Sequence, residues 1–114
     1  MLIKKSESVQ KSNGESCKVW EYEFGSDDIG IAMAIINWRY PEKWVAMNTQ
    51  CDQVYYVVSW SWTILSEQKW SFEVKAWDSY RYEKNEKYYV IWDNLEVILI
   101  NSPVWGPEQY VLSE

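Results

Sequence analysis

The chain has 114 residues, a net charge of −6, and a composition that is 47% hydrophobic and 25% charged. This length fits one domain, and the composition is that of a folded chain rather than a disordered one. The acidic balance excludes the basic face with which proteins contact nucleic-acid phosphates, and it disfavours an acidic membrane surface. We therefore expect no nucleic-acid partner and no membrane partner.

Short runs typical of β-strands follow one another from residue 17 onward. Residues 1–16 are polar, so we expect a flexible N-terminal segment there. Residues 17–24 alternate, and residues 29–36 are almost entirely apolar, as in a strand buried on both faces. Six further runs have strand character: 54–59, 63–65, 71–75, 79–82, 88–91 and 95–100. Residues 95–100 alternate, and Asp93–Asn94 is typical of a turn between the last two runs. The regular spacing predicts an all-β sandwich or barrel of about eight strands, with little helix.

Two segments resemble the sequence motifs of the cupin family. In the first, an acidic residue, a Tyr-Val-rich strand and a Gly-x-Gly pair follow one another in cupins; here Gln53 stands at the acidic position, and Trp60 and Trp62 stand at the glycines. The spacing of the second motif reappears at Trp77, Glu83, Asn85 and Tyr88. Asn85 suits a position with positive φ. The resemblance implies a cupin-type antiparallel jelly-roll β-barrel, of the small RmlC-like kind, over residues 17–114.

The residues that hold a metal in cupins do not carry over to this chain. In the family, two histidines, an acidic residue and a later histidine bind the ion. Their positions correspond here to Ala46, Asn48, Gln53 and Tyr88, or to Met47 and Thr49 in place of the first two. The chain has no histidine, which is the ligand that transition-metal sites favour, and two neutral amides make a weak site. We expect no metal and no other cofactor.

The nine tryptophans stand beside only four glycines. Seven of them fall where the resemblance places glycine: Trp38, Trp44, Trp60, Trp62, Trp70, Trp77 and Trp92. Moving these seven to the glycine count gives eleven glycines and two tryptophans, which is a usual balance for a β-protein. One explanation is codon reassignment, because some bacteria read UGA as glycine where other translation tables give tryptophan. We favour glycine-like backbone positions over ordinary core tryptophans, and core tryptophans over exposed platforms for sugars.

The resemblance and the residues together lead to three hypotheses for function. The first is non-catalytic binding of a small molecule in the barrel. A metal-independent enzyme acting on a sugar or acid is the second, with Tyr88 or Glu42 moving protons. The third is a carbohydrate-binding module that uses exposed tryptophans. The absence of histidine and of paired carboxylates within the motif favours the first. The residues expected to line the barrel are Asn48, Gln53, Tyr55, Tyr82 and Tyr88.

Location and assembly are expected from weaker signals. The start of the chain, Met1 to Lys4, lacks a charged and then apolar leader. The two cysteines, Cys17 and Cys51, do not resemble a secreted disulfide scaffold. We therefore expect a cytoplasmic protein. Family members of this size usually pair, so the resemblance implies a homodimer, with the apolar face of residues 20–24 packing across the two-fold axis.

Overall fold

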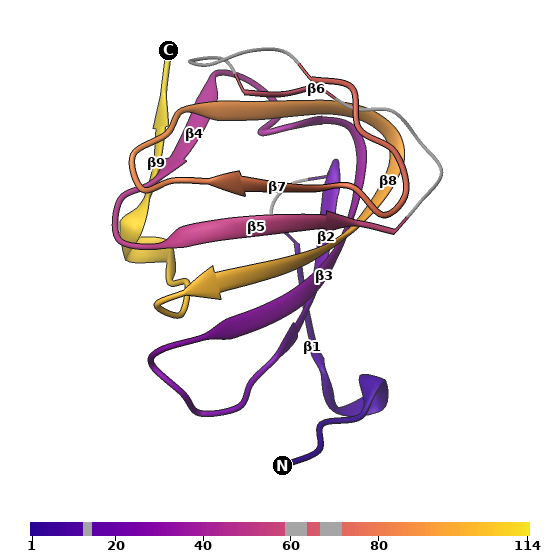
Figure 1. The fold of residues 1–114 in the computed structure, drawn as a ribbon, viewed down its shortest axis with the longest axis vertical. Helices are drawn as coiled ribbons and strands as arrows, with labels where there is room; N and C mark the ends of the chain where they lie inside the picture. Colours follow the sequence, from indigo (N-terminus) through magenta and orange to yellow (C-terminus); the bar gives the residue numbers. More distant parts are fainter. Residues whose placement is uncertain (13–14, 59–63, 67–71) are drawn as a thin grey trace.

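The structure is a computed structural model that describes residues 1–12, 15–58, 64–66 and 72–114. These residues form an all-β barrel, and Figure 1 shows its strands curving around a common interior. No helix in the described part of the chain is long and apolar enough to cross a membrane. The elements are η1 (Lys5–Glu7), β1 (Val9–Ser12), β2 (Cys17–Tyr22), β3 (Gly30–Tyr40), β4 (Val45–Asn48), β5 (Asp52–Val57), β6 (Ile64–Ser66), β7 (Ser79–Tyr82), β8 (Tyr88–Ser102), η2 (Pro107–Gln109) and β9 (Tyr110–Ser113).

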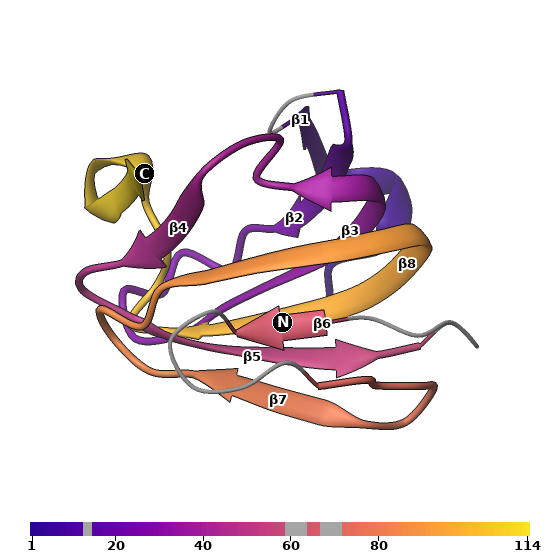
Figure 2. The ribbon, with the colours of Figure 1, turned by 90° about the horizontal axis from the view of Figure 1, so that it is seen from above.

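Strand β8 joins the two sides of the barrel. It is 15 residues long and pairs antiparallel with β3 along one edge, from Asn101 opposite Gly30 to Val90 opposite Tyr40. Near its start the same edge pairs with β4, at Tyr88 opposite Ala46. Its other edge pairs with β5 and, nearer its start, with β6. β2 and β1 extend the sheet beyond β3, and β7 extends it beyond β5. Figure 2 shows β8 sweeping around the end of the barrel between these neighbours.

The core follows from alternation along the paired strands. Leu95, Val97 and Leu99 of β8 are buried, whereas the side chains between them are partly exposed, which confirms the alternation predicted for residues 95–100. Val97 lies in register with Ala34 of β3 and with Val57 of β5, and both of these are also buried. Because side chains alternate with a period of two, this register directs one face of each strand inward.

The structure differs from the sequence prediction at the start of β8. Residues 88–91 and 95–100 were expected as two strands with a turn at Asp93–Asn94, but they belong to one strand. Between Trp38 opposite Trp92 and Ile36 opposite Leu95, three steps along β8 match two along β3. Asn94 has φ 65° there. The polar pair therefore forms a β-bulge with a left-handed residue, which turns the strand without ending it.

Other differences concern short segments. The N-terminal segment 1–16 contains β1, which pairs with β2 and was not predicted; the flexibility expected for this segment stays a prediction. Strands β4 and β9, which pair with each other, were not predicted. Residues 72–75 of the expected strand 71–75 have no strand structure; they lead into a turn in which Asp78 N donates to Lys75 O. These strands are short and lack a strong period, so local sequence does not reveal their pairing. The domain boundary at residue 17 stays a prediction.

Three of the seven tryptophans at expected glycine positions have a left-handed backbone. The φ angles are 77° at Trp38, 67° at Trp44 and 77° at Trp77, and these side chains are 72%, 41% and 61% exposed. Asn85, expected as a substitute for glycine, has φ 65°. A tryptophan in this region crowds its Cβ against the backbone, and its exposed ring gains little from burial. The predicted glycine-like backbone is therefore confirmed at these three positions.

The other four tryptophans of that set give less information. Trp92 lies within β8 opposite Trp38. Trp60, Trp62 and Trp70 lie outside the described residues, so their interpretation stays a prediction.

We predict that replacing Trp38, Trp44 and Trp77 together by glycine stabilises the tryptophan-bearing chain. Each left-handed non-glycine residue costs about 1–2 kcal/mol, and glycine gives back part of this through its larger entropy loss on folding. The free energy of unfolding should rise by about 2–3 kcal/mol, measured by urea unfolding. Trp105→Gly is the control, and it should lower stability by about 3 kcal/mol because it empties a packed position. A triple variant of lower stability would show that the three rings act as core residues.

One outer face of the barrel carries a row of apolar side chains. Trp20 of β2 lies opposite Met33 of β3, and Met33 lies opposite Ile98 of β8, which in turn lies opposite Tyr56 of β5. The first three side chains are partly exposed, and Tyr56 is 36% exposed. An apolar sheet face of this kind suits packing against a second copy of the chain.

We predict that the protein is a homodimer that pairs through this face. Light scattering at micromolar concentration should return twice the chain mass of 13.7 kDa. Ile98→Glu should shift the mass toward the monomer, because it would bury an unpaired charge in the interface. Leu112→Glu, on exposed β9, is the matched control and should leave the dimer intact. A monomer mass for the unaltered protein would contradict the prediction.

Candidate functional site

A cavity of about 300 Å³ lies inside the barrel. Its wall comes from β2, β3, β5 and β8, and it is closed on one side by residues 104–110. The apolar part of the wall includes Val19, Ala32, Ala34, Ile36 and Leu99. Ala32 and Ala34 are consecutive inward positions on β3 and are buried. Two small side chains in succession on a long inward face leave room where larger residues would fill the core.

The polar end of the cavity is built from side-chain amides. Gln53 on β5 lies in register with Asn101 on β8, and Gln53 Nε2 donates to Asn101 Oδ1 at 2.8 Å. Asn48 Nδ2 lies 3.5 Å from Gln53 Oε1, and Trp105 Nε1 donates to Asn48 Oδ1 at 2.9 Å. Gln53 and Asn101 line the cavity and are only 5% and 6% exposed. The cross-strand register thus holds two buried amides in the wall of the cavity, beside the apolar side chains of β2 and β3.

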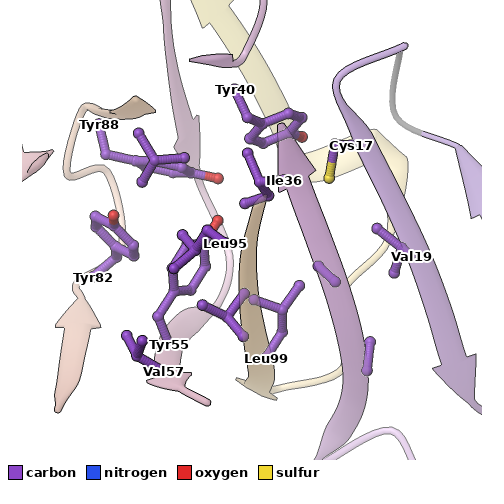
Figure 3. Close-up of a cluster of buried hydrophobic side chains, with 14 of the residues drawn as sticks. Cys17, Val19, Ile36, Tyr40, Tyr55, Val57, Tyr82, Tyr88, Leu95 and Leu99 are labelled. Atoms are coloured by element: carbon purple, nitrogen blue, oxygen red, sulfur yellow. The ribbon is translucent and has the colours of Figure 1, made fainter. Parts of the chain in front are cut away.

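Tyrosines form the neighbouring part of the wall. Tyr55 and Tyr88 line the cavity, and their ring centroids lie 6.4 Å apart. Tyr82 packs behind both, with centroids 5.0 Å from Tyr55 and 4.2 Å from Tyr88. Figure 3 shows the Tyr55 and Tyr88 hydroxyls directed toward the interior between the strands. Burial raises the pKa of each of these three phenols above its ordinary value, so they act at neutral pH as uncharged hydrogen-bonding groups.

Two more tyrosines and a cysteine complete this end of the site. Tyr40 and Tyr110 line the cavity beside Cys17, and the two tyrosine rings stack with centroids 6.4 Å apart. Burial raises the pKa of the Cys17 thiol to about 12. The thiol therefore stays protonated at neutral pH, and it is the thiolate that acts as a nucleophile. Burial also raises the pKa of the Tyr40 and Tyr110 phenols.

The structure brings together three of the five residues expected to line the barrel. Gln53, Tyr55 and Tyr88 face the cavity. Asn48 and Tyr82 are not among the lining residues in the described part of the chain; they lie behind the wall and hold Gln53, Tyr55 and Tyr88 in place. Asn48 and Tyr82 are therefore supporting residues. The β-strand period predicts which side chains point inward, but it does not predict which of them reach the cavity surface.

Glu42, considered as a proton carrier, lies elsewhere. It is exposed, and its Oε1 accepts a hydrogen bond from the Glu15 backbone N–H at 2.8 Å.

Asn101 is the residue that sequence reasoning missed most clearly. The alternation Leu95, Val97, Leu99 continues to Asn101, so the period placed this amide on the inner face.

The residues at the family's metal positions do not fit a metal ion. Ala46 has no donor atom, and the side-chain oxygen of Asn48 accepts a hydrogen bond from Trp105. Gln53 Oε1 faces the Asn48 amide, and the Tyr88 phenol is held in its protonated form by burial. The alternative position Thr49 donates its hydroxyl to Gln109 O at 2.9 Å. Among the described residues, no group of three or more His, Cys, Asp or Glu side chains could hold an ion.

No protein-family model matches the sequence, and no curated protein matches it. Solved structures resemble the fold closely. PAC13 from Streptomyces, in a variant solved with uridine, is 14% identical, with a TM-score of 0.86 over 100% of this chain and 90% of that one. Pac13 is described as a unique nucleoside dehydratase. An RmlC-like cupin from Shewanella frigidimarina is 13% identical, with a TM-score of 0.69 over 87% of this chain and 86% of that one.

An ectoine synthase from P. lautus is 11% identical, with a TM-score of 0.76 over 100% of this chain and 91% of that one. At these identities the likeness concerns the fold. The long shared strand β8, the enclosed cavity and the likeness to these barrels all indicate one fold. The chain has the cupin fold, as its two sequence motifs implied.

Proposed function

We propose that this protein binds a small, ring-shaped polar molecule inside the barrel and does not transform it. The observation that carries the proposal is the buried Gln53–Asn101 amide pair in the wall of an otherwise largely apolar cavity. Ligand sites in proteins are usually enclosed apolar spaces with a few well-placed polar groups. Beyond the hydrogen bond within the pair, Asn101 has amide N–H donors at the cavity wall, which suit a carbonyl oxygen on a heterocycle.

A nucleoside is the first class of ligand to test. PAC13, whose fold this chain shares with a TM-score of 0.86, was solved with uridine. The base of a nucleoside presents carbonyl and N–H groups on a flat ring, and the cavity offers amides together with the faces and edges of several tyrosines. Aromatic side chains favour offset or edge contacts with such rings.

Binding is favoured over catalysis by the protonation states of the phenols and the thiol beside the amide pair. An acid–base catalyst works best with a pKa near the operating pH. Burial moves the pKa of Tyr55, Tyr88 and Cys17 upward, away from neutrality. Glu42, the other candidate in a metal-independent isomerase-like enzyme, is exposed and bonded to Glu15 N. The cytoplasmic location expected from the sequence agrees with a nucleoside-class ligand and stays a prediction.

We predict that Gln53→Leu weakens uridine binding at least tenfold in titration calorimetry. The change keeps approximate side-chain volume and removes the donor to Asn101 and the acceptor facing Asn48. It should lower stability by only about 1–2 kcal/mol, because the neighbouring amides can turn to water in the cavity. Gln10→Leu makes the same chemical change on exposed β1 and should leave the affinity unchanged. Equal affinity for the two variants would place the ligand outside the cavity.

We also predict that the purified protein carries no stoichiometric transition metal. The reason is the donor set at the family's ligand positions, which offers neutral amides already engaged in hydrogen bonds. Elemental analysis should find zinc, iron, nickel and manganese well below one ion per chain after dialysis. The prediction would be contradicted by one equivalent of any of these metals that is lost in a Gln53→Leu variant. The protein would then bind a metal as other cupins do.

A further inference from the structure

The mouth of the cavity is acidic. Glu21 at the end of β2, and Glu23 and Asp27 in the connection from β2 to β3, are among its lining residues. No lysine or arginine lines the cavity within the described part of the chain. Any ligand that enters from this side passes three carboxylates before it reaches the amides of Gln53 and Asn101.

A nearby cation neutralises this charge only in part. Lys11 Nζ on β1 lies 2.8 Å from Glu21 Oε2 and 3.9 Å from Glu23 Oε1. The hydrogen bond to Glu21 raises the pKa of Lys11, so the ammonium stays charged. The Lys11 ammonium forms ion pairs with these two carboxylates, and Lys11 does not itself line the cavity. The carboxylates of Glu21, Glu23 and Asp27 form the rim of the cavity. Because one ammonium faces three carboxylates, the rim keeps a net negative charge.

The interior offers nothing that would compensate an anion. Its polar groups are the side-chain amides, the phenols and the Cys17 thiol, all uncharged at neutral pH because burial keeps the phenols and the thiol protonated. A phosphate or carboxylate would lose its hydration without gaining a cationic partner, which is costly in a buried site. Repulsion from the rim carboxylates would also raise the free energy of an anion bound near the mouth, so it would lower the affinity as well as the rate of entry.

An uncharged ligand meets neither obstacle. Asn101 Oδ1 accepts the hydrogen bond from Gln53, while its own amide N–H groups have no partner among the described residues, although Asn101 lines the cavity. These N–H groups are available to a carbonyl oxygen of the ligand. We infer that the cavity selects by charge: it takes an unphosphorylated nucleoside and rejects the corresponding 5′-phosphate. This inference rests on the proposed function.

The test compares uridine with uridine 5′-monophosphate, two probes that differ by the phosphate alone. Titration calorimetry at low salt should show at least tenfold tighter binding of uridine. The ratio should narrow at high salt, because exposed charges are screened. In the Glu21→Gln and Glu23→Gln double variant the preference should fall at least tenfold, since two carboxylates are lost and Lys11 is left without its partners. Asp27→Asn alone should shift the ratio in the same direction.

The matched control is the Glu73→Gln and Glu114→Gln double variant. Both residues are exposed and do not line the cavity, so it changes the net charge of the protein equally while the rim stays intact. It should keep the preference of the unaltered protein. Equal affinity for the two probes, or a preference that the rim substitutions leave in place, would overturn the inference while the proposed binding stood. Failure of both probes to bind would overturn the proposed function, and this inference with it.

Discussion

The pairing of β8 with β3 on one side and β5 on the other is the constraint on which the rest of the barrel depends. Because one strand is shared, its inward face, Leu95 to Asn101, serves as the wall of both halves. Register errors along it would move this whole set of side chains outward. The bulge at Asn94 shifts the register between β8 and β3 by one residue, and it bends β8 just before the inward-facing set begins at Leu95.

The same register gives the cavity its chemistry. Gln53 and Asn101 face each other because β5 and β8 are aligned by their apolar residues, Tyr55 opposite Leu99 and Val57 opposite Val97. Buried amides are tolerated only when they are hydrogen-bonded, and here Asn48 and Trp105 continue the chain of contacts to the closing segment. The site is thus an uncharged amide end beside apolar and tyrosine side chains, at the positions where the resemblance to cupins implied a metal.

Local sequence predicted the parts of this arrangement that depend on local period. Gln53 and Tyr55 alternate within one strand, and the motif spacing placed Tyr88 with them. The resemblance to cupins also predicted a glycine-like backbone at Trp38, Trp44 and Trp77. Tyr40, Tyr110 and the acidic rim were not predicted, because they come from β3, β9 and the β2–β3 connection, which meet only when the barrel closes. The inward position of Asn101 could have been predicted, since Asn101 continues the inward alternation of β8.

The position of Trp105 has a consequence for optical measurements. Its indole lines the cavity and donates to Asn48, whereas Trp20 lies on the outer face of β2. In a chain with glycine at the seven positions, these two would be the only indoles. One of the two indoles would then stand in the wall of the cavity, and a ligand that displaces water beside Trp105 would change the tryptophan emission without any added label. The protein would carry its own reporter of occupancy, and Trp20 would serve as the internal reference.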